Sequence, residues 1–139
     1  MAVAVSGEQQ ADAFVHAPHN LLVDGQWVPA QSGKTFASIN PATEETLAEV
    51  AHGEAGDIEV AVQAARRAFD DDSEWRRMNA SDRGKVIWRI GDLIEENAEE
   101  LAMLESLDNG KPFSVAKAAD VPLAADLFHY MAGWPTKIE

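Results

Sequence analysis

The segment Leu104–Pro112, LESLDNGKP, gathers the residue types found in catalytic carboxylate sites and phosphate-binding loops. Leu104 and Leu107 have helical spacing, and Gly110 stands just past that run, where a left-handed residue commonly ends a helix. Pro112 then prevents the helix from resuming. These residues therefore predict the end of a helix and not a phosphate loop.

Asp108 is not explained by this helix end. An acid in the last turn faces the negative end of the helix dipole, which disfavours it by roughly 0.3–1 kcal/mol. Two interpretations stay open: Asp108 is an ordinary surface residue, or its carboxylate binds a cation that also neutralises the last helix carbonyls.

The four histidines do not form a metal-binding pattern in the sequence. His16 and His19 bracket Pro18, so no helix presents them on one face, and His52 and His129 stand alone. Zinc sites use three or four converging ligands. A structural or solvent-exposed role is therefore favoured for all four.

Other catalytic patterns are also missing from the sequence. Glu95-Glu96 and Glu99-Glu100 lie on the polar side of predicted helices, where a solvated surface is the favoured interpretation because acid–base pairs need environments that separate their pKa values. No serine stands in a GxSxG motif, and there is no GxGxxG or GxxxxGK loop. The absence of cysteine excludes disulfides, thiolate ligands and thiol nucleophiles.

Length and composition suit one globular domain. The chain has 139 residues, of which 46% are hydrophobic, enough for a packed core. A net charge of −13, from 24 acidic and 11 basic side chains, repels phosphates and anionic lipid, so we expect neither a nucleic acid nor a membrane partner. Without a signal-peptide pattern, a long apolar run or cysteine, the chain is expected to be cytoplasmic.

The elements that would position these residues divide into a β part and a helical part. Residues 1–19 are expected to form a flexible tail, because they lack sustained periodicity. Two short strands flank Asp24-Gly25, a dipeptide typical of a type I′ hairpin. Two further strands, residues 35–39 and 46–50, flank a turn at Pro41.

The rest of the chain predicts about four amphipathic helices. Apolar stripes start near residue 58, after Asn79 and after Asn97, and the two asparagines resemble N-caps of capping boxes. The last helix is expected to begin near Asp120, because Pro122 suits a first turn. Its stripe comprises Leu123, Leu127, Phe128, Met131 and Trp134. We therefore predict an α+β arrangement.

Four motifs occur in this order: FASINPAT (36–43), DIEVAVQAARRAF (57–69), the long stretch from Trp75 through LDNGKP, and YMAGW (130–134). The ordered set, over residues 20–139, resembles the N-terminal segment of the cofactor-binding domain in the NAD(P)-dependent aldehyde dehydrogenase superfamily. The likeness is to the group that includes betaine-aldehyde and phenylacetaldehyde dehydrogenases. The resemblance implies that the Rossmann-like cofactor core lies downstream of this segment.

The resemblance also implies roles for particular residues. Related enzymes hold a monovalent cation, K⁺ or Na⁺, at positions that match the backbone carbonyls of Ser38 and Ile39 and the carboxylate of Asp108. The helix before YMAGW lines the substrate entrance in relatives, which makes Asp120 and Leu123 candidate channel residues. NAD or NADP, an aldehyde substrate, and homo-oligomer partners are implied for the complete enzyme.

The chain departs from the family pattern where the chemistry is performed. The family's catalytic cysteine, general-base glutamate, oxyanion asparagine and cofactor-binding glycine loop all lie downstream of YMAGW. We therefore expect a truncated N-terminal piece that is inactive alone and that exposes apolar surface. The alternative is a non-enzymatic acidic helical module, or a remnant, that docks on a partner or on an intact dehydrogenase subunit.

Overall fold

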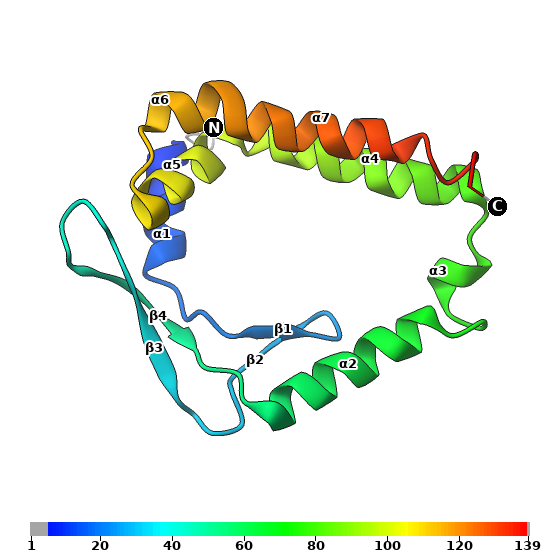
Figure 1. Ribbon diagram of the computed structural model, residues 1–139, viewed down its shortest axis with the longest axis horizontal. Helices are drawn as coiled ribbons and strands as arrows, with labels where there is room; N and C mark the ends of the chain where they lie inside the picture. Colours follow the sequence, from blue (N-terminus) through cyan, green and yellow to red (C-terminus); the bar gives the residue numbers. More distant parts are fainter. Residues whose placement is uncertain (1–5, 139) are drawn as a thin grey trace, which may run out of the picture.

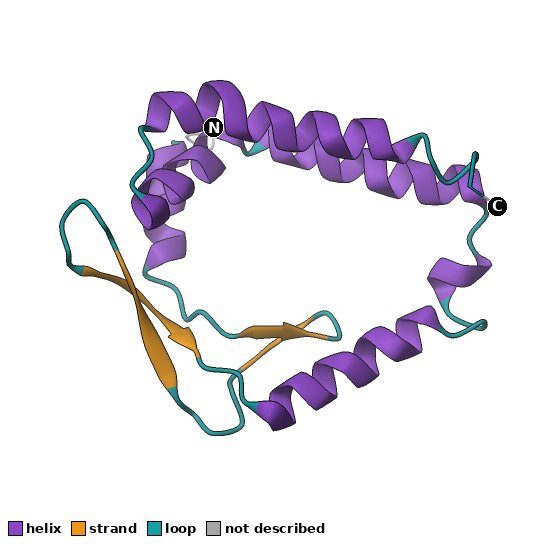
Figure 2. Cartoon of the chain, viewed as in Figure 1, coloured by secondary structure: helices purple, strands orange, loops and turns teal. Residues whose placement is uncertain are grey.

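The computed structural model describes residues 6–138, which form an open ring (Figure 1). The two long helices α4 (Ala80–Glu96) and α7 (Val121–Ala132) lie side by side along one edge, and the hairpins and α2 (Ala55–Phe69) lie opposite. Figure 2 shows that strands occupy only one corner of the ring and helices the rest. The α+β architecture predicted from the sequence is confirmed.

The β part consists of two antiparallel hairpins. β1 (Leu21–Val23) pairs with β2 (Gln26–Val28), and β3 (Thr35–Ile39) pairs with β4 (Thr46–Ala51). The Asp24-Gly25 turn joining β1 and β2 has positive φ at both residues, 53° and 73°, as a type I′ turn requires. The predicted strands and turn are thus confirmed.

A helix precedes the hairpins, in the segment that the sequence predicted to be a tail. α1 (Gly7–Val15) begins at a capping box in which Ser6 Oγ accepts from the Gln9 backbone N–H and Gln9 Oε1 accepts from the Ser6 N–H. Ala11 of this helix is fully buried, and α1 packs on α5 (Ala98–Asn109). Residues 1–5 of the predicted tail lie outside the described residues.

The helical part contains more elements than the sequence predicted. A short helix, α3 (Glu74–Arg77), separates α2 from α4, and the final helix begins with α6 (Phe113–Val115) and the π-helical turn η1 (Ala116–Asp120). α7 itself begins at Val121, with Asp120 as N-cap and Pro122 in its first turn, which confirms the expected start near Asp120, although α6 and η1 add helical turns before it. In η1 the Val121 N–H donates to the Ala116 carbonyl, and this wider turn relieves the clash that Pro122 would cause inside a regular α-helix.

Caps fix the two central helices. Asn79 Oδ1 accepts from the Asp82 N–H at 2.9 Å, which confirms Asn79 as an N-cap. Asn97 stands at the predicted boundary, but its side chain donates to the Leu93 carbonyl and the expected capping box is not formed.

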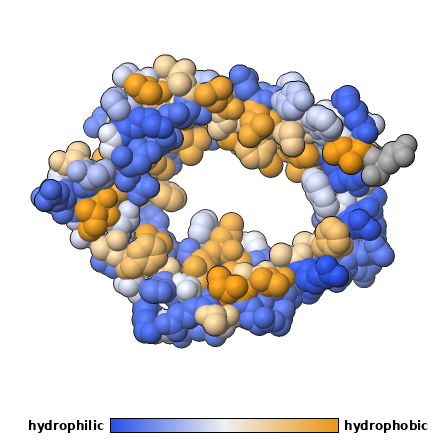
Figure 3. All heavy atoms as spheres, in the orientation of Figure 1, coloured by the Kyte–Doolittle hydropathy of each residue, from blue (hydrophilic) through white to orange (hydrophobic). Residues whose placement is uncertain are grey.

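The described residues bury small side chains and leave large ones exposed. The buried hydrophobic residues are eight alanines and one valine, and the one compact cluster joins Ala102, Ala116 and Val121. In α7 most of the predicted stripe is exposed, with Leu123 at 65% and Leu127 at 59%, whereas Ala125 and Ala132 are buried and lie close to Gly91 and Gly84 of α4. Figure 3 shows apolar side chains along the inner rim of the ring, so the predicted exposure of apolar surface is confirmed.

Candidate functional site

Two segments with motif character, distant in the sequence, meet where α5 ends beside the β3–β4 hairpin. The Ser38 hydroxyl donates to Asp108 Oδ1 at 2.9 Å, across 70 positions of the chain. Gly110, the residue after α5, has φ 77°, and a Cβ there would lie 3.0 Å from Cγ of Pro41. Gly110 thus provides both the left-handed helix end and the close approach of the Pro41 turn.

The hairpin is irregular at this contact. The β3–β4 register pairs Ser38 with Ala48 but Ile39 with Thr46, so Leu47 is an extra residue in a β-bulge. Bulges are frequent beside functional sites because they redirect the local backbone. The structure therefore brings Ser38 and Asp108 together, and Ile39, which follows Ser38 in β3, is 46% exposed.

The charge around the end of α5 is negative. Its last turn contains no basic residue. Lys111 Nζ is shared between Glu105 Oε1 at 2.6 Å and Asp120 Oδ2 at 2.7 Å, and these hydrogen bonds raise the pKa of Lys111. Among the described residues, the Asp108 carboxylate has only the neutral Ser38 hydroxyl as a hydrogen-bonding partner. A cation at this position would offset both the negative charge of the Asp108 carboxylate and the partial negative charge at the helix C-terminus.

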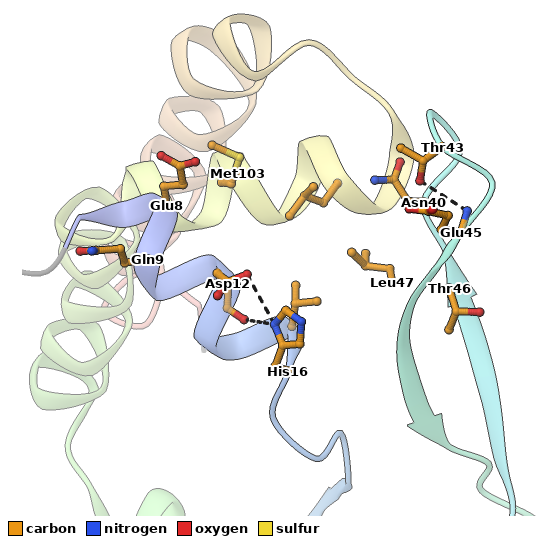
Figure 4. Close-up of a pocket in the computed structure, with 12 residues that line it drawn as sticks. Glu8, Gln9, Asp12, His16, Asn40, Thr43, Glu45, Thr46, Leu47 and Met103 are labelled. Carbon is orange, nitrogen blue, oxygen red and sulfur yellow. Dashed lines mark hydrogen bonds and ion pairs between the residues drawn. The ribbon is translucent and has the colours of Figure 1, made fainter.

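A cavity of 530 Å³ lies between α1, the end of α5 and the β3–β4 turn (Figure 4). Its histidine, His16, has Nδ1 at 2.8 Å from the Asp12 backbone oxygen and at 3.5 Å from its carboxylate. Both side chains are 74% exposed, so the pair has the character of a solvated surface contact. A second cavity, of 310 Å³, has Ser38 and Asp108 in its wall.

The two candidate channel residues lie at the start of the last helix. Asp120 ends η1 with its carboxylate on Lys111, and Leu123 lies one turn further on, 65% exposed. The ion pair fixes the Asp120 carboxylate on the side of α5. The channel role of both residues stays a prediction.

Sequence reasoning missed two groups of polar residues. Asp57, only 6% exposed, accepts from the backbone N–H groups of Gln31 and Glu54, each at 2.9 Å, and these bonds lower its pKa. Through these bonds Asp57 anchors the chain after β2 to the start of α2. The second group surrounds His129.

The interpretation of His129 as an isolated residue was wrong. Its Nε2 lies 3.0 Å from Asp92 Oδ1, and Glu95 offers a further carboxylate oxygen beside them. The two acids are three residues apart on α4, whereas His129 comes from α7. Only the pairing of these two helices could have revealed the group.

Comparison with known proteins places these features in a family. Residues 27–139 match the model of the aldehyde dehydrogenase family. The chain belongs to the aldehyde dehydrogenase family. The putative aldehyde dehydrogenase DhaS of Bacillus subtilis is 45% identical over 130 residues, which are 94% of this chain and 26% of DhaS.

Other relatives show the same partial coverage. The mitochondrial aldehyde dehydrogenase family 2 member B4 of Arabidopsis thaliana is 45% identical over 97% of this chain and 25% of its own length. The NAD⁺ complex of the aldehyde dehydrogenase from Bacillus cereus superposes with a TM-score of 0.92 at 41% identity, over 100% of this chain and 28% of that one. The chain thus spans about a quarter of the length of these dehydrogenases.

The strands of the described residues form two antiparallel hairpins, and the sequence contains no glycine-rich phosphate loop. No helix in the described part of the chain is long and apolar enough to span a bilayer.

Proposed function

We propose that residues 20–139 form the N-terminal segment of the cofactor-binding domain of an aldehyde dehydrogenase. In this proposal the segment takes part in the NAD(P)⁺-dependent oxidation of an aldehyde to a carboxylic acid. The observation that carries it is the superposition of this open ring on a quarter of a much longer NAD⁺-bound dehydrogenase chain.

The role of the segment is to support the rest of such a domain. Its exposed large side chains, such as Trp88 at 51% and Ile58 at 59%, lie on helices whose buried positions are mainly small residues. Removing apolar surface from water stabilises by about 25 cal/mol per Å². Further chain packed against these faces would therefore stabilise the ring.

The chain by itself is expected to be inactive toward aldehydes. Covalent aldehyde oxidation in the family needs a thiolate nucleophile, and this sequence contains no cysteine. Incubating the purified 139-residue chain with NAD⁺ or NADP⁺ and a small aliphatic aldehyde should produce no absorbance at 340 nm. Sustained turnover would overturn this part of the proposal.

A chimera tests the supporting role directly. The matching segment of the Bacillus cereus enzyme would be replaced by this chain, and its rate of NADH formation compared with that of the parent. We expect a rate within about tenfold, because 1.4 kcal/mol of lost positioning corresponds to that factor. A chimera with the parent's assembly state and no activity would argue for the non-enzymatic module instead.

We propose the end of α5 as a monovalent cation site formed by Ser38, Ile39 and Asp108. The support is the 2.9 Å contact between the Ser38 hydroxyl and the Asp108 carboxylate, beside a helix end without a basic residue. Backbone carbonyls of Ser38 and Ile39 would complete an oxygen shell of the kind that hard cations prefer. Bound there, the cation would supply charge neutralisation at the helix end.

The dependence of the chimera's activity on potassium concentration tests this site. Activity is followed while KCl replaces tetramethylammonium chloride at constant ionic strength, which separates specific binding from screening. Asp108→Asn should raise the KCl concentration needed for half the effect, whereas Asp12→Asn, a change to an exposed acid of α1, should not. Equal potassium dependence in both variants would refute the site.

A further inference from the structure

A group of three potential metal ligands joins α4 and α7. Asp92, Glu95 and His129 each offer one atom, and these atoms lie within 4.8 Å of one another. Ligands bonded at about 2.0–2.2 Å to a tetrahedral ion lie roughly 3.4 Å apart. The Asp92–His129 pair, at 3.0 Å, already has such a spacing, and a rotation of the exposed Glu95 side chain would complete it.

The imidazole of His129 is held in place by its surroundings. Its ring stacks on Trp88, with centroids 4.3 Å apart and planes inclined by 27°. It also lies against Gly91, where a Cβ would occupy the space of the ring. The His129 side chain is only 17% exposed, so its orientation toward Asp92 is set by packing. A fixed imidazole lowers the entropic cost of gathering the ligands.

The charge at this position favours a cation. The basic side chain of the same α4 face, Arg89, directs its guanidinium to Glu96 in two contacts of 2.6 and 3.1 Å. The Arg89 guanidinium is therefore engaged away from Asp92 and Glu95, in a chain whose net charge is −13. One nitrogen and two carboxylate oxygens suit a borderline divalent ion better than Ca²⁺ or Mg²⁺, which prefer oxygen alone.

We propose that Asp92, Glu95 and His129 bind Zn²⁺ or a similar first-row divalent ion. The ion replaces the proton shared between His129 Nε2 and Asp92 Oδ1, and water occupies its remaining position. Because it bonds to both helices, it cross-links α4 to α7. This site is separate from the cation site at the end of α5 and does not rest on the proposed enzymatic function.

Calorimetry on the metal-free 139-residue chain tests the site. ZnCl₂ titrated at pH 7 should bind at one site, and binding should weaken at lower pH, where protons compete with the metal for its ligands. His129→Gln should weaken Zn²⁺ binding at least tenfold, since even loss of an outer partner of a ligand costs about 10–100-fold. His16→Gln is the matched control, because His16 also contacts an aspartate but belongs to no three-ligand group among residues 6–138.

Glu95→Gln is the second test of the metal site, in case His129→Gln disturbs folding. The Glu95 side chain is exposed and forms no hydrogen bond or ion pair with another described residue, so its loss should leave the helical circular dichroism unchanged. We expect it to weaken Zn²⁺ binding, while Glu49→Gln, an exposed change on β4, does not. Unchanged affinity in Glu95→Gln, or no Zn²⁺ binding in the parent chain, would overturn the proposal.

Tryptophan fluorescence locates the ion independently. NiCl₂ should quench the emission of Trp88, because a paramagnetic ion on His129 would lie beside the stacked indole. Trp88→Phe should remove most of that quenching and retain Ni²⁺ binding. Quenching that persists fully in Trp88→Phe would place the ion elsewhere.

Discussion

Replacing Gly84 with alanine tests how closely α4 and α7 approach. Gly84 is buried in α4, and a Cβ added there would lie 2.6 Å from the backbone oxygen of Ala132 in α7. Real Cβ atoms essentially never approach another atom within 3.0 Å, and a backbone oxygen does not rotate away as a side chain does. The variant must therefore separate the two helices at this end.

The magnitude follows from two opposing terms. Overpacking a well-packed contact costs typically about 1–3 kcal/mol. Alanine regains about 0.5–1 kcal/mol of helix stability relative to glycine. We therefore expect Gly84→Ala to lower the free energy of unfolding by about 1 kcal/mol. With a urea dependence of about 1–3 kcal/mol per M, the midpoint should fall by roughly 0.3–1 M.

Urea unfolding followed by circular dichroism at 222 nm measures this, with Gly56→Ala as the matched control. A Cβ at Gly56, in the first turn of α2, meets only the end of the flexible Gln31 side chain, at 2.7 Å. That variant should be neutral or more stable than the parent, by no more than about 1 kcal/mol. If Gly84→Ala is stabilised as much as Gly56→Ala, the close packing of α4 on α7 is refuted.

Three further changes test local contacts. Asn79→Ala removes the N-cap of α4 and should cost about 1 kcal/mol in urea unfolding, with the effect absent in Ala80→Ser next to it. The pKa of Asp57 is lowered in the folded chain, so its ionised carboxylate stabilises the fold above the unfolded-state pKa of 3.8. This stabilisation is lost as the pH falls through the folded-state pKa. Asp57→Asn should therefore be less stable than the parent at pH 7, and the difference should shrink in acid. The pKa of Lys111 is raised in the folded chain, so its stabilisation is fully present below the unfolded-state pKa of 10.5 and is lost as the pH rises through the folded-state pKa. Lys111→Met should lower the urea midpoint at pH 7 and reduce the fall of that midpoint at alkaline pH. A midpoint equal to the parent's would contradict a stabilising role.

The end of α5 shows how far sequence reasoning reaches into the candidate site. Gly110 and Pro112 predicted the helix end, because glycine and proline act on their own backbone dihedrals. The same reasoning identified Asp108 as a residue placed against the helix dipole. Local sequence patterns did not reveal the hydrogen-bonding partner of Asp108, because Ser38 lies 70 positions away and reaches Asp108 only through the bulged β3–β4 hairpin.

Local patterns also misled where a neighbour decided the outcome. The apolar stripe of α7 predicted its buried face, yet α7 packs on α4 through Ala125 and Ala132 and leaves Leu123 exposed. Hydrophobic periodicity indicates which face of a helix is apolar. The close packing of α7 on α4 depends instead on small residues of α7 that lie opposite glycines of α4. The helix start near Asp120 was confirmed, but the short helix α6 and the π-helical turn η1 before it were not predicted.

The sequence by itself determined the α+β class, both hairpins, most helix boundaries and the likeness to aldehyde dehydrogenases. These depend on short-range dihedral preferences, caps and ordered motifs, which are written in neighbouring residues. Only the tertiary structure decided that the helices close into an open ring, that Ser38 meets Asp108, and that His129 lies between two carboxylates of α4. These contacts depend on how elements far apart in the chain pack, and no local pattern encodes that arrangement.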